Sequence, residues 1–231
     1  FFIDCPTALA AELAQKLSFY RLRAKVAIEP LDALSVLAAW DGLDALQNAA
    51  TEYGLVYRDP RLPALGLRVL IPAEVAKQTA EDLRAALVDA SEYETHRITL
   101  GVPRGGLDFI YGDAFPHDAD LDKLHGVDFK KGCFVGQEVV SRVEHRGTAR
   151  NRIVPVQFEA HAAQDGSPVM AGDKTVGTMG SSAGRLGLAM LRVDRVADAM
   201  AAGVPLLAGG IPMRLRESAV ADFFKDAKAP G

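Results

Sequence analysis

The sequence predicts an α+β protein with two domains, a mixed body over residues 1–148 and a small C-terminal β-barrel over residues 149–231. Its length of 231 residues suits one large domain or two modest ones. Helix-like and strand-like patterns alternate through the first part, which favours an antiparallel sheet covered by helices. After Gly147 the chain changes to short strand-like segments separated by Gly, Pro and Asp, which is typical of a small barrel.

Apolar spacing of the helical kind marks four stretches of the body. In the first, Leu9, Leu13 and Leu17 lie four residues apart and follow a proline, which suits the first turn of a helix. Near the end of the body, Ser91 and Glu94 have the spacing of a capping box. The predicted helices cover residues 9–17, 43–53, 72–87 and 91–98.

Strand-like segments fill most of the remaining chain, apart from one long connection. Residues 101–129 are rich in Gly, Pro and Asp, which predicts an irregular segment, and long ordered loops in compact domains are usually functional. The strands predicted for the body cover residues 24–31, 34–40, 55–60 and 65–72. Those predicted for the barrel cover residues 151–160, 167–172, 174–182, 185–193, 204–210 and 211–218, with a short helix at 194–203.

Composition narrows the class of protein. The net charge of −4 argues against a protein that coats nucleic acid through phosphate contacts, so we expect no direct nucleic-acid binding. No apolar run reaches the length of a membrane span, so we expect no membrane partner. Cys5 and Cys133 lie far apart and form no CxxC pair, which excludes a disulfide framework and fits a reducing, cytoplasmic location.

One of these cysteines lies in the segment KKGCFVGQEVVSR, residues 130–142. Lys130 and Lys131, which precede Gly132 and Cys133, favour the thiolate, because a nearby cation lowers the pKa of a thiol. Gly132 and Gly136 allow a tight turn and a close approach to the backbone. The residues VVSR that follow are predicted to form a strand leaving the site. The alternative is that Cys133 is a small buried hydrophobe in a glycine-cornered turn, because free cysteines are often buried.

The order Lys-Gly-Cys-Phe-x-Gly-Gln-Glu over residues 131–138 resembles the signature of the YgfZ family, which is related to the glycine-cleavage T-protein. Looser similarity extends over residues 19–30, 97–109 and 176–192. The resemblance implies an aminomethyltransferase-like body with a C-terminal barrel, and a segment of chain before Phe1. It also implies an accessory function in the assembly, maturation or repair of iron–sulfur enzymes, including tRNA-modifying ones. Iron–sulfur enzymes or cluster-assembly factors are the implied partners, and the mitochondrial matrix is the implied location in a eukaryote.

The same resemblance implies a site around the cysteine and a possible cofactor, tetrahydrofolate. Cys133 is the candidate for the chemical step. Where Cys133 and Gln137 stand, the T-protein has Asp and Arg, and Thr99 stands where it has a glutamate for the pterin. These departures place the chain with the YgfZ branch rather than with glycine cleavage itself. A folate-dependent aminomethyl or methyl transferase is the alternative function, and whether the chain is an enzyme is left open. The candidate ligand-binding residues are Lys131, Gly132, Phe134, Gly136, Gln137, Glu138 and Arg142.

Histidines offer no spacing typical of a metal motif, so the sequence predicts no metal site. An iron–sulfur cluster normally takes four cysteine ligands, so Cys133 is at most one ligand of a cluster shared with a partner. His125 and His145 flank the motif, and either is a candidate base toward the thiol. The five histidines are His96, His117, His125, His145 and His161.

Two further charged sets lie near the predicted junction. Arginines that alternate on an extended segment share a face, which suggests either a basic strip for an acidic ligand or a solvated strand edge. Three alternating aspartates resemble the start of a calcium loop, but the glycine and the closing glutamate are lacking, so that motif is rejected. The two sets are Arg142, Arg146, Arg150 and Arg152, and Asp118, Asp120 and Asp122.

Overall fold

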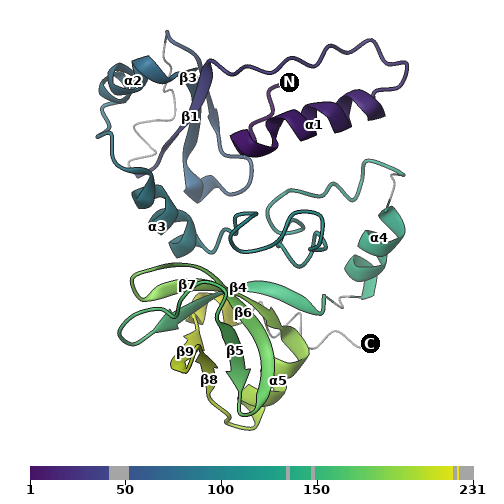
Figure 1. Ribbon diagram of the computed structural model, residues 1–231, viewed down its shortest axis with the longest axis vertical. Helices are drawn as coiled ribbons and strands as arrows, with labels where there is room; N and C mark the ends of the chain where they lie inside the picture. Colours follow the sequence, from purple (N-terminus) through teal and green to yellow (C-terminus); the bar gives the residue numbers. More distant parts are fainter. Residues whose placement is uncertain (42–51, 134–135, 147–148, 221–222, 224–231) are drawn as a thin grey trace. The chain divides into compact units, whose positions relative to one another are not determined.

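The computed structural model describes residues 1–41, 52–133, 136–146, 149–220 and 223 (Figure 1). The chain divides into two compact units. The first consists of residues 1–59 with 66–88, and the second of residues 60–65 with 89–231. Most of the helix predicted at 43–53 lies outside the described residues.

The first unit is built on a three-stranded antiparallel sheet with the order β1-β3-β2. The central strand is buried most deeply, with Val69 and Ile71 fully inaccessible. Ala39, Leu67 and Leu83 complete this core. The elements are α1 (Thr7–Tyr20), β1 (Leu34–Ala39), β2 (Leu55–Arg58), β3 (Leu67–Pro72), the 3-10 turn η2 (Ala73–Val75) and α2 (Ala76–Asp82). They confirm three of the four strands and two of the helices predicted for this region.

Two predictions for the first unit are wrong in part. Residues 24–31 form no strand, and nearly all of them are exposed. The pattern is misleading because a strand needs a partner, and the sheet described for this unit consists of β1, β3 and β2 without the 24–31 segment. The helix predicted over 72–87 ends at Asp82, and Arg84 takes a left-handed conformation with φ 55°.

A closed antiparallel barrel forms most of the second unit, which confirms the barrel predicted for the last third of the chain (Figure 1). The strand order is β4-β7-β6-β5-β8-β9, and pairing of β4 with β9 closes the ring. Val156, Val169 and Leu191 fill the interior without exposure, and α5 adds Val196 to the same cluster. The elements are β4 (Asn151–Phe158), β5 (Pro168–Ala171), β6 (Lys174–Ala183), β7 (Leu186–Arg192), α5 (Val193–Ala201), β8 (Leu206–Ala208) and β9 (Ile211–Leu215).

Helix α3 (Ala90–Leu100) packs on the outside of this barrel, where Ile98 contacts Ile153 and Leu188. Its N-cap is Asp89, whose side chain accepts a hydrogen bond from the Ser91 backbone N–H at 2.9 Å. The capping box predicted from Ser91 and Glu94 is therefore wrong. A capping aspartate satisfies the same free N–H groups, which leaves Glu94 available for other partners.

The long irregular connection predicted over 101–129 is confirmed, since its described residues are turns and coil with one isolated bridge between Gly105 and Phe109. This connection, the short turn η1 (Pro63–Leu65), α3 and α4 (Gln137–Arg146) belong to the same compact unit as the barrel. The domain boundary expected at 148/149 stays a prediction. The aminomethyltransferase-like character of the body stays a prediction.

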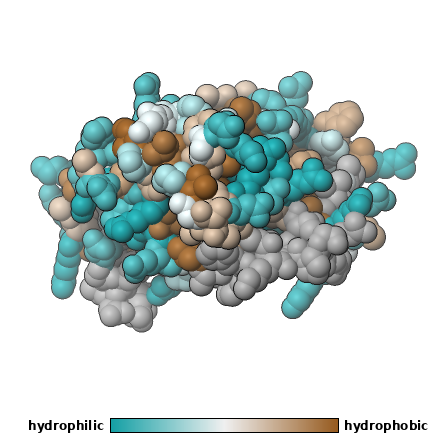
Figure 2. All heavy atoms as spheres, turned by 90° about the horizontal axis from the view of Figure 1, so that it is seen from below, coloured by the Kyte–Doolittle hydropathy of each residue, from teal (hydrophilic) through white to brown (hydrophobic). Residues whose placement is uncertain are grey.

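Surface character agrees with the composition. In the view of Figure 2, hydrophilic residues cover much of the described surface, and hydrophobic ones form smaller groups between them. Among the described helices, none combines the length and apolar character needed to cross a membrane.

Candidate functional site

The cysteine segment is exposed. Lys131, Gly132 and Cys133 all lie at the surface, and Cys133 is a free thiol. Its burial as a small hydrophobe, the alternative interpretation, is therefore excluded in this structure. Gly132 has φ 92° and Gly136 has φ 86°, and a Cβ on either glycine would meet nothing within 4 Å. The two glycines are thus needed for left-handed backbone rather than to make room for a close neighbour.

Helix α4 begins directly after Gly136 and contains VVSR, so the strand predicted for these residues is wrong. The positive φ of Gly136 turns the chain, and Val140 and Val143 then lie three residues apart on one side of a helix. Val140 is buried, which anchors that side. Two adjacent valines suggested a strand, but this helical face outweighs the weak β-propensity of the pair.

The candidate binding residues take different positions around this turn. Gln137 is half-buried, whereas Glu138 and Arg142 are exposed on α4. Glu138 lies in the first helical turn, where the helix dipole stabilises a negative charge. Phe134 lies outside the described residues, as does the His145 side chain. His125 is exposed, with a left-handed φ of 58°, and its role as a base stays a prediction.

A buried ion-pair network joins α3 and the long connection to the barrel, and sequence reasoning missed this network. Arg97 on α3 donates from Nη1 to Asp108 Oδ2 at 2.9 Å. Asp108 Oδ1 accepts from Ser181 on β6, from its backbone N–H at 2.7 Å and from its hydroxyl at 2.6 Å. A Cβ on Gly180 would lie 2.4 Å from Asp108 Oδ1. Gly180 therefore leaves the space that the carboxylate occupies.

Glu94 extends the network to the surface. It accepts from Arg97 Nη2 at 2.6 Å and from Arg104 Nη1 at 2.7 Å. Burial opposes ionisation of this carboxyl, but the hydrogen bonds and charges of Arg97 and Arg104 outweigh it. The pKa of Glu94 is therefore held below its usual 4.5.

The lowered pKa of Glu94 predicts a pH-dependent contribution to stability. Because the pKa is lower in the folded than in the unfolded chain, the stabilisation is present above pH 4.5 and is lost as the pH falls through the folded pKa. We expect Glu94→Gln to be less stable than the wild type at neutral pH, with the difference shrinking below pH 4.5. Urea unfolding across this range measures it, with exposed Glu217→Gln as the control. A difference that stays constant with pH would contradict the prediction.

A second buried arginine corrects the predicted basic strip. Arg152 on β4 is 6% exposed and donates to Asp122 through both Nη atoms, at 2.7 and 2.9 Å. Its Nη1 also donates to the His117 carbonyl at 2.7 Å. Arg142 lies on a helix and Arg152 is buried, so the arginines do not share the face of one extended segment. Burial raises the pKa of Asp122, but the Arg152 guanidinium outweighs this and leaves the pKa lowered.

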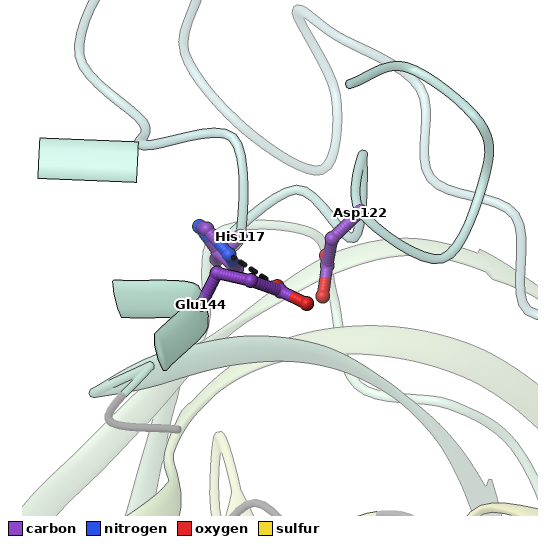
Figure 3. A group of neighbouring side chains, drawn as sticks. All are labelled: His117, Asp122 and Glu144. Carbon is purple, nitrogen blue, oxygen red and sulfur yellow. Dashed lines mark hydrogen bonds and ion pairs between the residues drawn. The ribbon is translucent and has the colours of Figure 1, made fainter. Parts of the chain in front are cut away.

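Two residues bonded by Arg152, His117 and Asp122, meet a third side chain that comes from α4. His117 and Asp122 lie on the long connection and Glu144 lies on α4, with one ligand atom of each within 4.8 Å of the other two (Figure 3). His117 Nε2 lies 3.3 Å from Glu144 Oε2. The sequence predicted no metal site, because Glu144 stands 27 residues after His117 and no short motif spans that separation.

Comparison with known proteins first identifies the class of barrel. The family model described as the C-terminal beta-barrel domain of CAF17 matches residues 150–222. This range contains all strands of the closed barrel from β4 to β9. The match therefore agrees with the fold of the last third of the chain.

Similar curated proteins then extend the comparison beyond the barrel. The chain is 33% identical over 213 residues to the iron-sulfur cluster assembly factor IBA57, mitochondrial, of Homo sapiens, which covers 85% of this chain and 57% of that protein. It is 32% identical over 212 residues to the Mus musculus protein of the same name, with the same coverage. The Mycosarcoma maydis homologue is 39% identical over 158 residues, or 68% of this chain and 38% of that protein. The chain thus spans less than two thirds of the length of these homologues.

Proposed function

We propose that this chain acts in the assembly or maturation of iron–sulfur proteins, with Cys133 as its working thiol. The observation that carries the proposal is the exposed, free Cys133 directly after Gly132, whose backbone is left-handed. The homologues support the same function, because their names describe them as iron-sulfur cluster assembly factors. A thiol held at the surface is accessible to a second protein, whereas a buried cysteine would be inert.

Cys133 acts in this proposal as a temporary ligand of a cluster that passes between proteins. Clusters normally take four cysteine ligands, and this chain has only Cys5 and Cys133. A cluster on Cys133 therefore takes its remaining ligands from a partner protein. The cluster is the cargo, and the thiolate of Cys133 is displaced when a receiving protein supplies a ligand of its own.

Tetrahydrofolate is not used in this proposal, because the described residues of α3 do not fit it. Thr99 offers a hydroxyl rather than a carboxylate, and its backbone carbonyl already accepts a hydrogen bond from Arg216. The carboxylate of Glu94 is bound by Arg97 and Arg104. Among the described residues of α3, neither position thus offers a free carboxylate to pterin N–H donors.

Partners and location follow from the same proposal. We propose that the partners are iron–sulfur enzymes or cluster-assembly factors, and that the enzymes served include those that modify tRNA. In a eukaryotic cell the proposed location is the mitochondrial matrix, because the homologues are named as mitochondrial proteins.

Complementation tests the role of Cys133. We expect full-length Cys133→Ala to accumulate normally in cells that lack their own copy, yet to leave a radical iron–sulfur tRNA methylthiolation enzyme inactive. The wild-type protein should restore the modified tRNA, which mass spectrometry of nucleosides measures. Cys5→Ala is the matched control, because Cys5 is also an exposed free cysteine. We expect this variant to restore activity as well as the wild type.

Two outcomes would distinguish the role of Cys133 from the function proposed for the chain. If Cys133→Ala restores activity fully, the chain can still act in iron–sulfur maturation but Cys133 is not its working group. If the wild type itself fails to restore the enzyme, the proposed function is wrong for this client, whatever the role of the thiol.

A further inference from the structure

We infer that His117, Asp122 and Glu144 form a binding site for one divalent metal ion. The bound ion joins the long connection before the cysteine segment to α4 after it. All three side chains belong to the second compact unit. In Figure 3 they point toward one another, His117 and Asp122 from the long connection and Glu144 from α4. The inference does not depend on the function proposed for Cys133.

Distances within the group suit a shared ion. Ligand atoms about 2.1 Å from a tetrahedral metal lie about 3.4 Å from each other. The separation of His117 Nε2 from Glu144 Oε2 is already 3.3 Å. The ligand atoms all lie within 4.8 Å of one another, so closure around an ion needs only a small movement. Glu144 can supply that movement, because its side chain is 43% exposed on the surface of α4.

Burial and hydrogen bonding make His117 the anchor of the group. The residue is only 2% exposed, and its Nδ1 has no hydrogen-bond partner among the residues that the structure describes. Nε2 is thus the ring atom that the described structure engages, and it faces the two carboxylates (Figure 3). Binding of an ion at Nε2 places the ring proton on Nδ1. Because histidine ligands usually donate that proton to a partner, we expect an exchangeable ion rather than a permanent structural one.

Arg152 does not block the site, although it binds the same aspartate. Each Asp122 oxygen accepts one hydrogen bond from Arg152, at 2.7 and 2.9 Å. An ionised carboxylate has about four lone-pair positions, so each oxygen keeps one for an ion. The arginine therefore acts as an outer support that fixes the orientation of Asp122. Such outer partners are common around metal-binding carboxylates.

The donor set indicates the kind of ion. One imidazole nitrogen and two carboxylate oxygens suit a divalent first-row ion such as Mn²⁺, Fe²⁺ or Zn²⁺, whereas a site without a thiolate binds Cu⁺ weakly. His117 and Asp122 precede Cys133 in sequence and Glu144 follows it. An ion bound by all three joins the long connection to α4, and so restrains the segment that carries the thiol.

Mn²⁺ titration followed by electron paramagnetic resonance tests the site, because the six-line signal of free Mn²⁺ disappears on binding and Mn²⁺ avoids thiolates. We expect the whole chain to bind one Mn²⁺ at sub-millimolar concentration. Glu144→Gln should weaken binding at least about tenfold, since losing a ligand costs no less than losing an outer partner. This variant changes an exposed residue, so folding is preserved. Glu159→Gln, also exposed in the same unit, is the control and should bind as the wild type does.

His117→Gln is the second variant, with circular dichroism to verify its fold, and it should lose the same Mn²⁺ site. Equal affinity in the wild type, Glu144→Gln and Glu159→Gln would overturn the inference, because the ion would then bind scattered surface carboxylates. Absence of Mn²⁺ uptake by the wild type at millimolar concentration would overturn it as well.

Discussion

Arg97→Met is expected to lower the free energy of unfolding by about 3–5 kcal/mol, the range measured when one partner of a buried ion pair is removed. Arg97 is 1% exposed and Asp108 is 5% exposed, so the substitution leaves a buried carboxylate without its cation. The Val102 carbonyl also loses its bond to Arg97 Nη1. Urea denaturation followed by circular dichroism measures the loss.

Arg104→Met provides the matched control for this result. Arg104 binds the same Glu94, but its side chain is 53% exposed. Exposed ion pairs contribute about 0–1 kcal/mol, so its removal should have a small effect. Equal losses for Arg97→Met and Arg104→Met would show that burial of the pair does not set its importance.

A double substitution separates the charge effect from lost packing. In Arg97→Met with Asp108→Asn the uncompensated charge is gone, while the amide oxygen can still accept from Ser181. We expect the double variant to be more stable than the sum of the single losses predicts, by about 0.5–3 kcal/mol, the range of coupling between contacting residues. Strictly additive losses would exclude a direct interaction between the two side chains.

This network also shows why part of the structure could be predicted and part could not. The barrel follows from local signals, because its short strands and their Gly, Pro and Asp turns are contiguous in sequence. Arg97 meets Ser181 across 84 residues and Asp108 meets it across 73. No spacing rule reaches that far. The only local trace is Gly180, whose missing side chain leaves room for Asp108.

The candidate site also has features that could be predicted from the sequence and features that could not. The exposure of Cys133 and the glycine turns around it agree with the motif, which is local. The segment after it was misread, because two adjacent valines resemble a strand until Val140 is seen buried on a helical face. The sequence offers no signal that His117 and Glu144 lie close together, and none that His117 is buried. Tertiary packing determines both the helix after Cys133 and the burial of His117, and a pattern of neighbouring residues does not reveal tertiary packing.

Gly66 in the first compact unit gives the second large expected effect. It has φ 92°, which L side chains rarely adopt, and an added Cβ would lie 2.0 Å from the Ala39 carbonyl oxygen. That carbonyl cannot move away easily, because Ala39 pairs with Leu67 at the end of the central strand. The Gly66 carbonyl also accepts a bond from the Asp59 N–H at 2.9 Å, which fixes the turn on its other side.

Gly66→Ala should therefore destabilise the first unit by roughly 2–5 kcal/mol, combining about 1–2 kcal/mol for a left-handed alanine with about 1–3 kcal/mol for displaced backbone. Trp40 is the only tryptophan of the chain, and its Cα would lie 3.0 Å from the new Cβ, so its fluorescence reports unfolding of this unit.

Gly112→Ala is the control that isolates the cost of the left-handed backbone, because Gly112 has φ 82° and nothing within 4 Å of an added Cβ. A loss for Gly66→Ala no larger than for Gly112→Ala would mean that the Ala39 carbonyl yields to the methyl group. A Trp40 transition that moves to lower urea, while the main circular dichroism transition of the barrel unit stays in place, would show in addition that the two units unfold separately.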